Sequence, residues 1–201
     1  MTAAIVGGCV VTVADVEARE RQLRAGPQAA ALPVPGTSEG RQLRRWLTQL
    51  IATEQVIAAH AAALGLTADG APSEDEVLPD MTARVEIGSI AAAALGNPLA
   101  RTVFREVTAA VEVTEEQVTA YHERNPLRFA AGAQGGVGWR RPAAPPRLAQ
   151  VRPVITAHLV AAARRRAFRC WLDERSAELV HLAPGYEHPG DPRQPDNTHK
   201  H

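Results

Sequence analysis

The stretch SEGRQLRRWLTQLIATEQVIAAHAAALGL, residues 38–66, decides the fold of this chain. Its large apolar side chains recur at spacings of three, four and seven residues, while arginines and glutamines fill the positions between them. The apolar stripe comprises Leu43, Trp46, Leu47, Leu50, Ile51, Ile57 and Leu64. This pattern predicts one long amphipathic helix, and Gly65 supplies a stop at its C-terminal end.

A second stripe of the same kind predicts another long helix over residues 147–177. Its apolar positions, Leu148, Val151, Ile155, Leu159, Ala162, Phe168 and Leu172, lie close to the period of an α-helix. Pro153 falls inside this stretch and is tolerated only in the first turns or at a kink. Two long helices that each carry an apolar stripe need each other, or shorter helices, to bury it.

Shorter helices are predicted between the two long ones, over residues 81–95 and 98–110. An acidic, proline-bearing linker, TADGAPSEDEVLPD, precedes them. The segment VTEEQVTAYHERNP then gives a sharp helix signal, because Thr114 and Gln117 form a capping box and Pro126 ends the helix. The body of the chain is therefore expected to be helical throughout.

Short strands are predicted only near the two ends of the chain. AAIV and CVVTV flank Gly7 and Gly8, a pair suited to a hairpin turn, and Thr12 can cap the helix that follows. AELVHLAP, residues 177–184, alternates like a strand. Because the backbone groups of a short strand need partners, we expect the two ends to pair. The predicted fold class is mainly α with short N- and C-terminal β-strands pairing.

Composition excludes several classes of function. The chain has 201 residues, of which 45% are hydrophobic and 4% aromatic, and its formal net charge is zero. A general nucleic-acid binder would carry a basic excess, so no nucleic-acid partner is expected. No stretch approaches the apolar length that spans a bilayer, and the first residues do not resemble a signal peptide. We therefore expect a cytoplasmic protein with no membrane partner, in which Cys9 and Cys170 are buried thiols.

Four segments together resemble the chaperone domain of SurA-type parvulin prolyl isomerases. GGCVVTVADVEARERQLR (7–24) is similar to the family's opening strand, turn and first helix, and residues 41–66 to its long helix. VTEEQVTAYHERNPLRF (113–129) resembles the segment that precedes the isomerase domain, and the final helix and strand resemble those that return after it. The resemblance covers roughly residues 5–183.

The chain departs from that family where the isomerase domain would lie. Only residues 130–146, a Gly/Pro-rich linker, separate the two flanking segments, which is too short for such a domain. The resemblance thus implies a helical domain over 1–183 that binds a polypeptide or partner protein without prolyl isomerase activity. We expect the binding groove to lie between the two long helices. The residues predicted to line it are Trp46, Leu50, Ile57, Ile155, Leu159 and Phe168.

The C-terminal tail PGYEHPGDPRQPDNTHKH, residues 184–201, lies beyond this resemblance. An extended backbone would place His199 and His201 on one side, and His188 adds a third imidazole. Such a set suits a transition metal such as zinc, iron or copper. A tail docked on the body without metal, and a tail without fixed structure, remain alternatives. The metal interpretation carries an alternative function, a repurposed, metal-dependent enzyme acting on a small molecule.

Two further interpretations stay open. The cluster Arg164, Arg165, Arg166 and Arg169 is a solvated helix face offset by nearby carboxylates, or it receives an anionic ligand or partner. The short N-terminal strand beside a glycine turn also permits exchange between two chains, which would give a homodimer.

Overall fold

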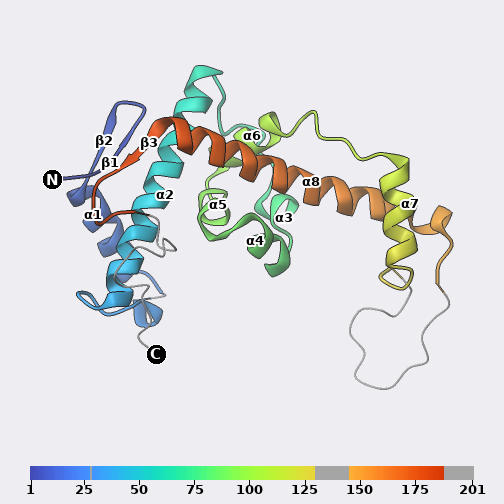
Figure 1. The fold of residues 1–201 in the computed structure, drawn as a ribbon, viewed down its shortest axis with the longest axis horizontal. Coiled ribbons are helices and arrows are strands. Elements are labelled where there is room, and N and C mark those ends of the chain that lie inside the picture. Colours follow the sequence, from blue (N-terminus) through green and yellow to red (C-terminus); the bar gives the residue numbers. More distant parts are fainter. Residues whose placement is uncertain (28, 130–144, 188–201) are drawn as a thin grey trace.

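The computed structural model describes residues 1–27, 29–129 and 145–187 (Figure 1). It is mainly helical, with one small antiparallel sheet, as the sequence predicts. The elements in the described ranges are β1 (Thr2–Val6), β2 (Cys9–Thr12), α1 (Val13–Arg24), a 3-10 turn η1 (Ala29–Ala31), α2 (Ser38–Ala63), α3 (Glu74–Val77), α4 (Met81–Ile87), α5 (Ser89–Ala94), α6 (Pro98–Val107), α7 (Glu115–Arg124), α8 (Leu148–Leu179) and β3 (Val180–Leu182).

The sheet joins the two ends of the fold. Its strand order is β2-β1-β3, so the first strand of the chain is the central one. β1 pairs with β2 through a turn at Gly7 and Gly8, whose φ angles of 55° and 89° favour glycine. On its other edge β1 pairs antiparallel with β3, with Ala4 opposite Leu182. The predicted hairpin and the predicted pairing of terminal strands are both confirmed.

Local signals set the ends of the first two helices. Thr12 caps α1 in a reciprocal capping box with Asp15, as expected. At the end of α2, Gly65 adopts a φ of 63° and its amide donates to the Ala62 carbonyl at 3.2 Å. The next amide, that of Leu66, reaches back to Ala61 at 2.9 Å, which completes a Schellman motif.

Two sequence-based expectations need correction. The helix predicted over 81–95 is divided into α4 and α5 by Gly88, whose φ of 91° lies outside the helical region. The acidic linker contains a helix, α3, because Ser73 and Glu76 form a capping box at its start. Pro153 lies inside α8, in its second turn, and the helix continues past it.

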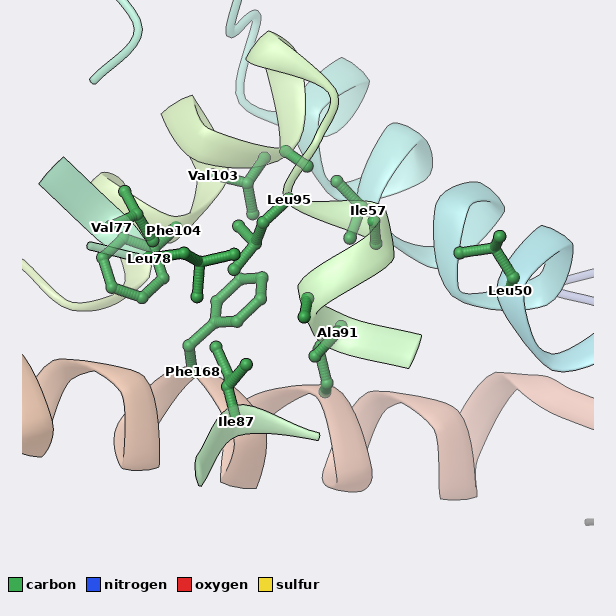
Figure 2. Packing of buried hydrophobic residues seen from close by; sticks show 14 of the residues in the cluster. Leu50, Ile57, Val77, Leu78, Ile87, Ala91, Leu95, Val103, Phe104 and Phe168 are labelled. Carbon is green, nitrogen blue, oxygen red and sulfur yellow. The ribbon is translucent and has the colours of Figure 1, made fainter. Parts of the chain in front are cut away.

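The main core lies between α8, α2 and the short helices α3 to α6. Figure 2 shows Phe168 pointing from α8 into this cluster, close to Phe104 and Leu78. Phe168 is fully buried, and its ring meets that of Phe104 edge-on with centroids 5.2 Å apart and stacks on Trp171 at 5.5 Å. Fully burying a side chain of this size stabilises the fold by about 1.5–3 kcal/mol.

Two smaller clusters lie at opposite ends of α8. One packs the sheet against α1 and α2. The other buries Val118 of α7 against Val151 and Ile155 of α8, far from the sheet (Figure 1). We call α7, which packs mainly on α8, the α7 arm. Across the described ranges, no helix combines the length and apolarity needed to cross a membrane.

Candidate binding surfaces

The predicted groove residues do not line one common groove. Leu50, Ile57, Ile155 and Phe168 are each at most 6% exposed and pack in the hydrophobic clusters. Trp46 is partly buried between two clusters, and its indole Nε1 donates to the Ser89 hydroxyl at 3.0 Å. Leu159 is partly buried and borders a surface cavity. The apolar stripes of α2 and α8 thus build core, and Leu159 is the one predicted residue on a cavity described below.

A groove of about 640 Å³ lies between α7 and α8, and we call it the α7–α8 groove. Apolar and small side chains form most of its surface, with Leu159 from α8 and Tyr121 from α7 among them. Charged groups stand among them, including Arg124 and Arg166. The described lining is Val113, Glu116, Gln117, Ala120, Tyr121, Arg124, Leu159, Ala162, Ala163 and Arg166.

Two titratable groups in and beside the groove have lowered pKa values. The hydrogen bond with the Thr114 side chain lowers the pKa of Glu116, so this carboxylate is ionised at neutral pH. Behind the groove, His158 contacts the rings of Tyr121 and Phe129, with centroid separations of 5.5 and 6.1 Å. Burial lowers the pKa of His158, which therefore packs as a neutral ring.

A second cavity, of about 660 Å³, lies between α8, α6, α3 and the loop before α3. We call it the arginine pocket. Its described lining is Gly70, Ala71, Pro72, Glu76, Val77, Phe104, Arg105, Ala157, Val160, Ala161, Arg164 and Arg165. The two cavities lie on opposite faces of α8, because Ala161 and Ala163 are separated by about 200° around the helix axis.

The three arginines of this pocket differ in their hydrogen bonds. Arg165 is 6% exposed and directs Nε and Nη2 to one oxygen of Glu86, both at 2.8 Å. Arg105 donates from Nη1 to the Gly70 carbonyl at 2.7 Å. The Nε of Arg164 is buried, and it has no hydrogen-bond partner among the residues that the structure describes.

The two cavities have similar types of lining side chain. Of the described residues that line them, none is a histidine, cysteine or serine. The lining residues offer apolar contacts, guanidinium groups and carboxylates. The hydrogen bond from the Ser73 backbone lowers the pKa of Glu76, so the arginine pocket retains one negative charge at neutral pH.

The metal and cysteine expectations have different outcomes. His188, His199 and His201 lie outside the described residues, as does most of the 130–146 linker. Within residues 1–27, 29–129 and 145–187, no three His, Cys, Asp or Glu side chains are grouped so as to hold a metal ion. Cys9 and Cys170 are both exposed free thiols, so the expectation that they are buried is wrong. Cys9 is the first residue of β2, directly after the turn at Gly7 and Gly8, and the first two residues of this strand are exposed.

Comparison with known proteins gives one match. A family of unknown function, DUF7158, matches residues 2–39, which comprise the β1–β2 hairpin, α1 and the connection to α2. No curated protein and no solved structure matches the chain. The match covers the part of the chain that forms one side of the sheet cluster and contains neither cavity.

Proposed function

We propose that this protein binds unfolded polypeptide segments in a chaperone-like manner, with the α7–α8 groove as its binding surface. The observation that carries the proposal is the groove itself, an apolar surface between two helices with charged groups among its lining residues. Grooves of this kind accept apolar side chains and satisfy polar backbone groups at their edges. The sequence resemblance to SurA-type chaperone domains supports the same class of function.

The α7 arm is held by few buried residues, which would let the groove accept client segments of different size. Among the described residues, its cluster buries Val118, Val151 and Ile155, against a much larger central core. Regions held by few buried contacts open and adjust at low free-energy cost. An arm that shifts on α8 can widen or narrow the α7–α8 groove for segments of different size. Small residues along the groove, Ala120, Ala162 and Ala163, leave room for a client side chain.

The proposal includes no prolyl isomerase activity and no nucleic-acid partner. Its client is a polypeptide, and the expected cytoplasmic location stays a prediction. The alternative, a metal-dependent enzyme that uses His188, His199 and His201, also stays a prediction. Elemental analysis of untagged protein tests that alternative, because a metal site would retain a near-stoichiometric amount of zinc, iron or copper.

Two matched variants test the proposal. Ala163→Phe fills the α7–α8 groove, whereas Ala161→Phe places the same ring on the opposite face of α8, in the arginine pocket. Both alanines are half-buried, so the two substitutions perturb the helix similarly. Aggregation of reduced insulin chains, followed by light scattering, should be suppressed by the original protein and by Ala161→Phe but not by Ala163→Phe. Failure of the original protein to suppress aggregation, or equal suppression by both variants, would refute the proposal.

A further inference from the structure

The arginine pocket is a second cavity, which client binding in the α7–α8 groove would not use. It lies on the other face of α8 and differs in chemistry, because three of its lining side chains are arginines. Its volume of about 660 Å³ falls within the usual range for sites that bind small molecules. Figure 2 shows Val77 and Phe104 beside each other at one edge of the core cluster, and both also line this pocket.

The charges in the pocket are not balanced. Glu86 neutralises Arg165 through the paired contacts at 2.8 Å, so Arg165 is a structural residue. In the described part of the chain, no carboxylate lies within salt-bridge distance of Arg105 or Arg164. Glu76 is the only acidic residue among the described lining residues. Two guanidinium groups against one carboxylate leave a local excess of one positive charge.

Arg164 gives an independent indication of a missing ligand. Its Nε is buried without a hydrogen-bond partner in the described structure, although buried donors in native proteins are almost always paired. Leaving such a donor unpaired costs free energy, and more so for a charged group. Arg164 also lines the pocket, so an anion seated there would lie beside its guanidinium group.

We propose that the arginine pocket binds a small organic carboxylate with an apolar body. A guanidinium matches a carboxylate in a two-bond geometry, and Arg164 and Arg105 are the groups positioned to hold it. The apolar body of the ligand packs on Val77, Phe104 and Val160. A single negative charge balances the pocket, whereas a phosphate dianion would be opposed by Glu76. This inference does not depend on client binding in the α7–α8 groove.

Isothermal titration calorimetry of the full chain with sodium octanoate tests the proposal. Octanoate should bind with one-to-one stoichiometry, and 1-octanol, which has the same apolar body without the charge, should bind at least about tenfold more weakly. Arg164→Met keeps most of the side-chain volume and should weaken octanoate binding about tenfold or more. Inorganic phosphate, used as a competitor, should displace octanoate poorly.

Two further variants keep the test decisive. Arg166→Met removes a guanidinium from the opposite face of α8 and should leave octanoate affinity unchanged. Ala161→Phe fills the arginine pocket and should abolish octanoate binding while aggregation suppression persists. Circular dichroism confirms that each variant is folded. The proposal is overturned if octanol binds as tightly as octanoate, if octanoate does not bind, or if Arg164→Met and Arg166→Met weaken it equally.

Discussion

The ion pair between Arg165 and Glu86 connects α8 to α4. Removing Glu86 should lower the stability of the fold much more than removing Arg165. The Arg165 side chain is 7% exposed, and that of Glu86 is 33% exposed. Glu86→Ala leaves a buried guanidinium without its partner, a change that costs about 3–5 kcal/mol in fully buried pairs. Because Glu86 is partly solvated, we expect a smaller cost of about 2–3 kcal/mol. This corresponds to a fall of about 5–10 °C in melting temperature for a chain of this size.

Arg165→Met removes the buried charge itself, so it should cost only about 1 kcal/mol, and the double variant should be no less stable than Glu86→Ala. Urea unfolding, followed by far-UV circular dichroism, measures all three. The control is Glu115→Ala, which breaks the exposed pair of Glu115 with Arg152 of the same helix α8. That change should cost no more than about 1 kcal/mol. A cost for Glu86→Ala no larger than for Glu115→Ala would refute this reasoning.

Three other predictions concern packing and protonation. Leucine substitutions at Phe104 and Phe168 should show a coupling of about 0.5–1.5 kcal/mol in a double-mutant cycle, and additive costs would argue against their edge-on contact. Gly40→Ala should lower the melting temperature despite alanine's higher helix propensity, because its Cβ would lie 2.5 Å from the Val34 carbonyl oxygen. Because burial lowers the pKa of His158 below its usual 6.5, stability should be complete above pH 6.5 and fall as the pH drops below it. His158→Gln should flatten part of this fall below pH 6.5 in urea titrations, and His60, whose pKa burial also lowers, accounts for another part.

Local signals made much of the fold predictable. Thr12 with Asp15, and Thr114 with Gln117, form capping boxes within four consecutive residues, and each begins a helix in the structure. The same signal, Ser73 with Glu76, is present in the acidic linker and begins α3, although a proline lies close to each end of this short helix. The break at Gly88 was harder to predict, because a single glycine inside an apolar, alanine-rich run is tolerated in many helices.

The binding surfaces were less predictable, because helical periodicity reports burial and does not distinguish a core from a groove. Leu50 and Phe168 fit the stripe as well as Leu159 does, yet only Leu159 reaches a cavity. The partner of Arg165 lies 79 residues away, on α4, and no local pattern joins them. One usable signal was the run Ala161-Ala162-Ala163, since small side chains on both faces of a helix leave space beside it.

The place of β1 between β2 and β3 determines how the fold responds to a pulling force. Ala4 lies opposite Leu182, so the start of β1 and the end of β3 lie at the same end of the sheet. Because antiparallel hydrogen bonds run perpendicular to the strands, tension on the two ends of the chain loads these bonds singly and in succession. The sheet then opens like a zipper from its outer end, at low force. Beyond β3, Arg45 of α2 donates from Nε to the Gly185 carbonyl at 3.1 Å and Tyr186 packs against the same cluster, so tension on the C-terminal end loads α2 before the sheet has opened.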